Sequence, residues 1–316
     1  MRVLLCFLSL TLQAQLLETR KIWDAAPHSA FTDLVLHRNA LWCVFREGAG
    51  HVSPDGAIRV LTSRDGTAWS SAALIRSNDG DLRDPHISIT PKGEMMLIAA
   101  AALKPGAKAR HQTFAWFSKD GKSWSEPTPI GDPDLWLWRV VWNHNKEAFG
   151  LAYTTTGATP NRIYRSTDGR HFESLGDAPS ECGVNETGVV FTKNGTRYVL
   201  ERREQCDKTA ALWTTTKQGS TEKSLNARIG GPVLIQLPDG RLLGAGRLHD
   251  NRVRTSLFWL NPSDATVQEI ATLPSGGDTS YPGLVYHKGI LYISYYSSHE
   301  GKTAIYFAKF KLPQVR

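Results

Sequence analysis

One seven-residue pattern occurs three times in the first half of the chain: SRDGTAW at residues 63–69, SKDGKSW at 118–124 and STDGRHF at 166–172. In each copy the Asp side chain can accept hydrogen bonds inside a tight turn, the Gly can adopt a positive φ, and the final aromatic ring can pack on a strand. The copies begin 55 and 48 residues apart. Turns repeated at such spacing indicate a fold built from similar β-units.

A second series of tight turns divides the whole chain into units of similar length. Each turn separates two runs of alternating apolar residues, and successive turns are 45 to 54 residues apart. The turns are Arg38-Asn39, Lys92-Gly93, Asn145-Lys146, Asn194-Gly195, Asp239-Gly240 and Lys288-Gly289. A period near fifty residues in an all-β chain is typical of a propeller. We therefore expect a six-bladed β-propeller of four-stranded antiparallel blades, closed by pairing of residues near 22–23 with residues 305–310.

The composition fits a folded, secreted domain. The chain has 316 residues, of which 41% are hydrophobic and 21% charged, and this excludes a disordered protein. The net charge is +7, but Lys and Arg are scattered, so we expect no nucleic-acid partner. Residues 1–14 predict a signal peptide: Arg2 precedes a short apolar stretch, and Ala14 suits cleavage. The apolar stretch is too short to span a membrane. We expect a secreted or periplasmic protein with one propeller over 15–316.

Three cysteines remain after the expected loss of Cys6 with the signal peptide. Cys182 and Cys206 lie symmetrically about the turn at 194–195, so a hairpin in register brings them together. We predict a disulfide between them and a buried free thiol at Cys43.

Equivalent positions of the six units should surround the propeller axis. The residues eight positions after each turn are Arg46, Ala100, Tyr153, Arg202, Arg247 and Tyr296. A second ring, before each turn, contains Asp33, Asp84, Arg139, Glu186, Gly231 and Tyr281. Arginines that face one channel repel each other unless negative charge offsets them. The arginines therefore either bind an anionic ligand or pair with structural acids, for which the candidates are Glu47, Glu186 and Glu204.

The three seven-residue repeats resemble the Asp-boxes of the sialidase (neuraminidase) superfamily, in a compact form that lacks one residue. The resemblance implies a sialidase-like propeller with a Tyr nucleophile, here Tyr281, activated by a Glu that lies sixteen residues before a triad Arg, here Glu186 and Arg202. Glu186 and Arg202 flank the turn at 194–195 symmetrically, so they can be neighbours on paired strands. It also implies an arginine triad for the substrate carboxylate. The residues expected to bind substrate are Arg46, Arg202, Arg247, Arg139, Tyr153 and Tyr296. The family's motif for its first triad Arg is absent, and AFTDL occupies residues 30–34 instead.

The general acid has three candidates. His51 and Asp55 lie in the loop where the family carries its acid, and Asp84 precedes the apolar strand of the second unit. The acid is distinct from the base Glu186, which the Tyr281 phenol needs because a phenol with a pKa near 10 is a poor nucleophile without a base.

The expected function is that of a secreted, retaining glycoside hydrolase resembling exo-α-sialidases, which acts on a sialoglycoconjugate or another acidic glycan. The sequence has no HExxH or CxxC metal motif, no phosphate loop and no dinucleotide fingerprint, so we expect neither metal nor cofactor. Two alternatives stay open. One is a lyase or hydrolase of uronic-acid polysaccharides that uses His51 and a Tyr, and the other is a non-catalytic carbohydrate-binding propeller.

Overall fold

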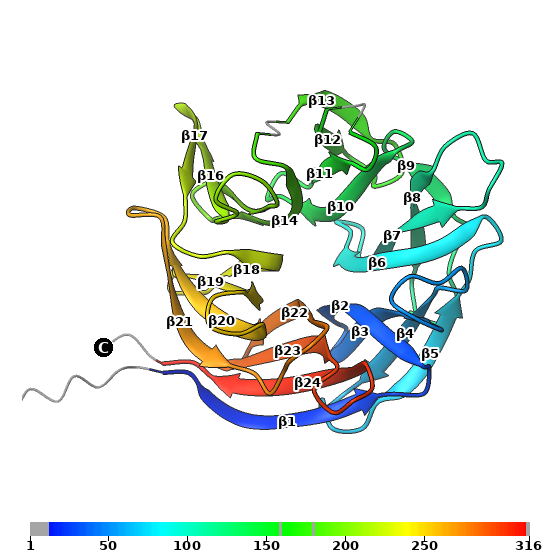
Figure 1. Ribbon diagram of the computed structural model, residues 1–316, viewed down its shortest axis with the longest axis horizontal. Coiled ribbons are helices and arrows are strands. Elements are labelled where there is room, and N and C mark those ends of the chain that lie inside the picture. Colours follow the sequence, from blue (N-terminus) through cyan, green and yellow to red (C-terminus); the bar gives the residue numbers. More distant parts are fainter. Residues whose placement is uncertain (1–12, 158–159, 179–180, 314–316) are drawn as a thin grey trace, which may run out of the picture.

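The computed structural model describes residues 13–157, 160–178 and 181–313, and it places six four-stranded antiparallel sheets around a common centre (Figure 1). The described residues contain 24 strands and no helix, so no helix in this part of the chain could cross a membrane. The all-β, six-bladed propeller predicted from the turns is confirmed. Most of the expected signal peptide, with Cys6, lies outside the described residues.

The blades follow one another along the chain, and the last blade takes its outermost strand from the N-terminal end. Blade 1 contains β2 (His28–His37), β3 (Ala40–Gly48), β4 (Ala57–Ser63) and β5 (Ser70–Ile75). Blade 2 contains β6 (Gly80–Ile89), β7 (Met95–Leu103), β8 (His111–Ser118) and β9 (Thr128–Ile130). Blade 3 contains β10 (Leu135–Trp142), β11 (Ala148–Thr154), β12 (Arg162–Ser166) and β13 (Glu173–Asp177).

Blades 4 to 6 repeat the arrangement. Blade 4 contains β14 (Val184–Phe191), β15 (Arg197–Arg203), β16 (Ala211–Thr216) and β17 (Gly219–Ser224). Blade 5 contains β18 (Ile229–Gln236), β19 (Leu242–Leu248), β20 (Arg254–Asn261) and β21 (Thr266–Thr272). Blade 6 contains β22 (Thr279–His287), β23 (Ile290–Ser297), β24 (Ala304–Lys311) and β1 (Gln15–Trp23). The first strands, β2, β6, β10, β14, β18 and β22, lie innermost (Figure 1).

The repeated seven-residue patterns form the turns between the third and fourth strands of blades 1 to 3. In the first copy, Asp65 Oδ1 accepts hydrogen bonds from the amides of Thr67 and Ala68, at 2.7 and 3.1 Å. Asp120 and Asp168 accept the corresponding bonds in the other two copies. The glycines have φ values of 71–75°. A Cβ on the second of them, Gly121, would lie 2.1 Å from the ring of Trp42 in blade 1, so the turn is also a contact between blades.

Hydrophobic contacts between neighbouring blades form the core. Six clusters of buried side chains each span two adjacent blades, one cluster for every neighbouring pair in the ring. Each sheet buries both of its faces against neighbouring sheets, which explains why the inner strands have buried residues on both faces. A seventh, smaller cluster of aromatic residues lies among the inner strands and includes Trp138 and Tyr281.

Strand β1 closes the ring. It pairs antiparallel with β24, and Trp23 lies opposite Ile305, as predicted. The indole of Trp23 donates a hydrogen bond to Glu47 Oε2 at 3.1 Å, which joins this strand to blade 1. The closure covers the edge that β24 would otherwise expose.

Every inner strand carries a register shift at the end opposite its tight turn. The extra residue at such a β-bulge redirects one side chain out of the strand's alternation. In four blades the bulged residue has a positive φ: Phe31 at 62°, Asp84 at 48°, Gly231 at 56° and Tyr281 at 46°. A positive φ is uncommon for residues other than Gly, and such residues concentrate at functional sites. The six bulges therefore mark the end of the propeller where a site should be sought.

Candidate active site

The bulged residues of four blades surround one side chain, Tyr281, which is the bulged residue of blade 6. The phenol ring lies 5.1 Å from the ring of Phe31 in blade 1 and 5.5 Å from that of Trp138 in blade 3, between ring centroids. The Tyr281 hydroxyl donates a hydrogen bond to Glu186 Oε1 of blade 4. A Cβ at Gly231 of blade 5 would lie 3.0 Å from the ring, so Gly at this position permits the close approach.

Two members of the second predicted ring lie elsewhere. Counting along the sequence placed Asp33 and Arg139 in that ring, whereas the bulges of β2 and β10 bring Phe31 and Trp138 to the Tyr281 ring. Asp33 and Arg139 pair with each other, with 3.2 Å between Arg139 Nη1 and the carboxylate. The cause is the extra residue of each bulge, which reverses the side that the following side chains face.

Tyr281, Glu186 and Arg202 form a hydrogen-bonded triad. Arg202 Nη1 lies 2.7 Å from Glu186 Oε1 and 3.5 Å from the Tyr281 hydroxyl oxygen. The second carboxylate oxygen of Glu186 accepts the amide of Gly231 at 2.7 Å. The sequence predicted this cross-strand placement of Glu186 and Arg202 and the approach of Tyr281 to Glu186.

The surroundings of this triad keep Glu186 ionised and Tyr281 neutral. Burial raises the pKa of Glu186, but the charge of Arg202 and hydrogen bonds from Arg202 and Tyr281 outweigh it and lower the pKa below its ordinary value. Burial and the nearby charges of Glu186 and Asp84 raise the pKa of Tyr281 well above its ordinary value. At neutral pH the site therefore contains a carboxylate next to a neutral phenol that donates to it.

Arg247 of blade 5 also lies beside Tyr281. Its Nε donates to the carbonyl of Thr279 at 2.7 Å, its Nη2 donates to the Tyr296 hydroxyl at 3.1 Å, and its guanidinium carbon lies 5.4 Å from the centroid of the Tyr281 ring. Within the described residues, Nη1 has no hydrogen-bond partner and can serve a ligand. Arg202 has a further partner in Glu204, so it pairs with two of the three acids that the sequence suggested as structural partners.

Arg46 does not join this cluster. Its side chain is fully buried, its Nε donates to Asp81 at 2.9 Å, and its terminal nitrogens donate to the carbonyls of Gly50 and Ser53. The guanidinium thus holds the 49–53 loop against blade 2. Glu47, the acid expected as a structural partner, pairs with Arg59 instead.

Among the three acid candidates, Asp84 is the one whose pKa responds to the charge of Glu186. Its residue is half-buried, and its carboxylate makes no hydrogen bond or ion pair with any described residue. Burial and the charge of Glu186 raise the pKa of Asp84 to about 8. Burial and the charges of Asp84 and Glu186 raise the pKa of Tyr153, another predicted site residue, well above its ordinary value. Its ring stacks on Trp136, with 6.2 Å between ring centroids.

The other two acid candidates have local partners. The Asp55 carboxylate accepts the amide of Ala49 at 3.1 Å, which closes its own loop. His51 Nδ1 lies 2.7 Å from Asp278 Oδ2, and Asp278 Oδ1 accepts the Tyr296 hydroxyl at 2.8 Å. Sequence reasoning missed Asp278, although it lies three residues before Tyr281.

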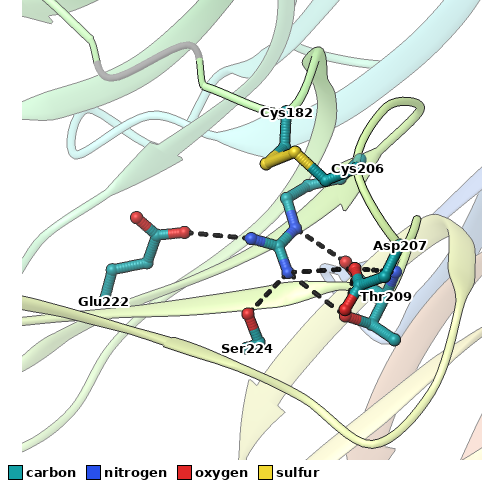
Figure 2. Close-up of a disulfide and its surroundings, with 7 residues drawn as sticks. Cys182, Cys206, Asp207, Thr209, Glu222 and Ser224 are labelled. Atoms are coloured by element: carbon teal, nitrogen blue, oxygen red, sulfur yellow. Dashed lines mark hydrogen bonds and ion pairs between the residues drawn. A yellow bond between two sulfur atoms is a disulfide. The ribbon is translucent and has the colours of Figure 1, made fainter.

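A disulfide joins the ends of the hairpin that carries Glu186 and Arg202. Cys182 and Cys206 are bonded, with a Cα–Cα distance of 5.2 Å, as predicted (Figure 2). Beside it, the guanidinium of Arg203 points away from the triad and binds Thr209, Ser224 and Glu222. Cys43 is buried and free, also as predicted.

Two surface hollows, of about 640 and 680 Å³, lie near the tight turns, at the other end of the inner strands. Their linings include Asn194 and Gly240 in one case and Arg38 and Asp65 in the other. Neither hollow contains a member of the triad. Glu186 and Asp84, the acids whose pKa values are shifted by burial and by nearby charges, lie at the bulged end, and such acids mark candidate sites.

The comparisons with known proteins concern the fold. The sequence matches no protein-family model, and no curated protein matches it. A solved protein of unknown function from Dyadobacter fermentans is 20% identical, with a TM-score of 0.83 over 95% of this chain and 99% of that one. An α-L-arabinofuranosidase from Fusarium graminearum is 12% identical, with a TM-score of 0.73 over 94% and 97%. A Trypanosoma rangeli sialidase is 12% identical, with a TM-score of 0.69 over 94% of this chain and 58% of that one. These likenesses establish a propeller fold shared with sialidases.

Proposed function

We propose that the protein is a retaining glycoside hydrolase that releases a terminal acidic sugar, sialic acid or a related one, from a glycan. The observation that carries the proposal is the contact of a neutral Tyr281 phenol with an ionised Glu186 carboxylate, with two arginines beside them. A paired phenol and carboxylate has a use in nucleophilic catalysis, whereas binding alone does not need it.

In the first step the Tyr281 oxygen attacks the anomeric carbon and its proton passes to Glu186, which the hydrogen bond between them favours. The bond from the anomeric carbon to the leaving-group oxygen breaks, and the protonated Asp84 supplies the proton which that oxygen needs. The second step reverses these transfers: Asp84 accepts a proton from water, water attacks the anomeric carbon, and Tyr281 leaves with the proton from Glu186. The anomeric configuration is retained because two inversions occur.

The charges around Arg202 and Arg247 favour an acidic sugar as the substrate. Arg202 is already balanced by Glu186 and Glu204, while Arg247 has only neutral hydrogen-bond acceptors among the described residues. A sugar carboxylate would supply the missing negative charge, and the planar guanidinium suits it. A neutral Tyr nucleophile also avoids the repulsion that a carboxylate nucleophile would meet from such a substrate.

The test is hydrolysis of a matched panel of aryl glycosides, with sialoside, uronide and neutral-sugar members. The proposal expects turnover of an acidic member with retained configuration, and an increase of about 10- to 100-fold in KM for Arg247→Lys. Arg241→Lys, at the turn end of blade 5, is the matched control and should keep the wild-type KM. Turnover of neutral sugars alone would contradict the proposal. An unsaturated uronide product would instead identify a lyase, and binding without turnover a carbohydrate-binding propeller.

A further inference from the structure

Two histidines and an aspartate converge beside the candidate active site, although they are far apart in sequence. His28 begins β2, His51 lies in the loop between β3 and β4, and Asp278 precedes β22. Asp278 Oδ2 lies 3.2 Å from His28 Nε2 and 2.7 Å from His51 Nδ1. The three atoms all lie within 4.8 Å of one another.

The carboxylate at the centre of this group is held in place from behind. Its other oxygen, Oδ1, accepts the Tyr296 hydroxyl at 2.8 Å, and the backbone carbonyl of Asp278 accepts the amide of Ser298 at 3.0 Å. Outer partners of this kind fix the orientation of metal-binding carboxylates. Tyr296 also contacts Arg247, so the group adjoins the proposed substrate site.

The histidines have few other uses in the fold. His28 is buried, and its second ring nitrogen has no hydrogen-bond partner among the described residues. The side chain of His51 is 51% exposed and that of Asp278 is 29% exposed, so the group opens to solvent on one side. Two imidazole nitrogens and one carboxylate oxygen are the donors that zinc and neighbouring transition metals prefer, with positions left for water.

We propose that His28, His51 and Asp278 bind one divalent transition-metal ion, for which Zn²⁺ is the natural probe. Tetrahedral bonds near 2 Å place ligand atoms about 3.3 Å apart. The separations here are 2.7 and 3.2 Å from the carboxylate oxygen and at most 4.8 Å between the ring nitrogens, so small side-chain movements would complete the site. The inference does not depend on the proposed glycosidase activity, because binding is measured without any sugar.

The test is calorimetric titration of Zn²⁺ into the untagged protein after treatment with a chelator. The wild type should bind one Zn²⁺, and His51→Ala and Asp278→Asn should weaken binding by at least about 100-fold, more than the loss of an outer partner usually does. Tyr296→Phe removes the hydrogen bond to Asp278, and also the one from Arg247, but no metal ligand, so it should weaken Zn²⁺ binding by about 10- to 100-fold. The matched control is His171→Ala: His171 also contacts an aspartate, at 2.7 Å, but is 90% exposed and belongs to no such group of three.

Two further measurements keep the proposal open to refutation. Co²⁺ bound to the wild-type protein should show visible absorption typical of nitrogen and oxygen ligands, which needs no variant to fold. Ca²⁺ should bind far more weakly than Zn²⁺, because Ca²⁺ prefers all-oxygen sites. The proposal is overturned if the wild type binds no Zn²⁺, if His51→Ala binds Zn²⁺ as the wild type does, or if Ca²⁺ binds equally well.

Discussion

The carboxylate of Glu186 receives hydrogen bonds from three blades. Arg202 of its own blade and Tyr281 of blade 6 donate to one oxygen, and the amide of Gly231 in blade 5 donates to the other. Desolvation of an ion this deep in the protein is costly unless such partners compensate it. The same contacts that keep Glu186 ionised therefore aim it at the phenol whose proton it should accept.

Replacing either half of this pair should remove most of the turnover. Tyr281→Phe lacks the nucleophilic oxygen, and Glu186→Gln lacks the base, so each should lower kcat by about 10²- to 10⁴-fold. The double variant should lose little more than the single variants, because the two groups act as a unit. Steady-state kinetics on the best substrate of the panel measures both effects. Tyr286→Phe, at the turn end of the same strand, is the control that should keep normal kcat.

The pH dependence of kcat/KM should reflect the ionisation of Asp84. Its pKa is raised to about 8, so the acid form is present at neutral pH, and kcat/KM should fall as the pH rises above about 8. Because the pKa of Glu186 is lowered, the acidic limb should lie below the usual range of a carboxylate. Asp84→Asn should lose the alkaline limb and should be most impaired with poor leaving groups. An unchanged alkaline limb in this variant would assign the proton to another group.

The same shift affects stability, which provides a folding control for the variant. The folded-state pKa of Asp84 exceeds the unfolded value of about 4. Its contribution to stability is therefore present at low pH and is lost as the pH rises towards about 8. Asp84→Asn removes this loss, so at pH 9 its melting temperature should equal or exceed that of the wild type. A lower melting temperature at pH 9 would show that the ionised carboxylate of Asp84 stabilises the fold, which contradicts a raised pKa.

The sequence predicts contacts between individual residues where both lie on one hairpin, because the turn sets which residues face each other. Glu186 and Arg202 were paired correctly because both flank one turn of known position. Arg46 was expected at the ligand site because its offset from the turn equals theirs. Its actual partner, Asp81, lies 35 residues away in another blade, and no pattern of spacing within one hairpin could indicate that contact.

At the scale of elements, the β-bulges decide which residues reach the axis. An offset counted from a turn assumes unbroken alternation, and a bulge changes the face of each residue beyond it. The second strands are regular, so the ring from Arg46 to Tyr296 could be counted correctly as equivalent positions. The first strands are not regular, so Phe31 and Trp138 were missed.

The hairpin β14–β15 provides a test at this scale, because its disulfide ties the strand ends that hold Glu186 and Arg202. Reduction, or the double variant Cys182→Ala with Cys206→Ala, should lower the free energy of unfolding by about 2–4 kcal/mol. Urea denaturation with and without reductant measures the change. Reductant should destabilise the wild type but leave the double variant unaffected. Equal stability of oxidised and reduced wild type would show that the hairpin needs no covalent tie.

At the scale of the whole molecule, stability depends on an unbroken ring. Each of the six core clusters lies between two blades, so an isolated blade has no hydrophobic core of its own. The blade number was predictable because each blade begins with a recognisable turn. The surroundings of the axis were not, because residues from all six blades meet there at long sequence separations.

Ring closure by β1 is testable by truncation. Deletion of 15–23 removes the β1–β24 pairing and the contact of Trp23 with Glu47, and it exposes the edge of β24. The truncated protein should melt at a clearly lower temperature and should self-associate, as size-exclusion chromatography would reveal. Leu17→Ser, at a residue of β1 that is 46% exposed, should behave like the wild type. A monomeric truncation with normal melting would rule out an essential role for β1 in closure.

The most direct test of the central claim is mass spectrometry of a trapped glycosyl-enzyme. A fluorinated acidic sugar with a good leaving group should form the covalent intermediate faster than water removes it. We expect the intact protein to gain the mass of one glycosyl group, peptide mapping to place that group on Tyr281, and Tyr281→Phe to gain none. Release of the leaving group without any adduct on Tyr281, or an adduct on a different residue, would contradict the assignment of Tyr281 as the nucleophile.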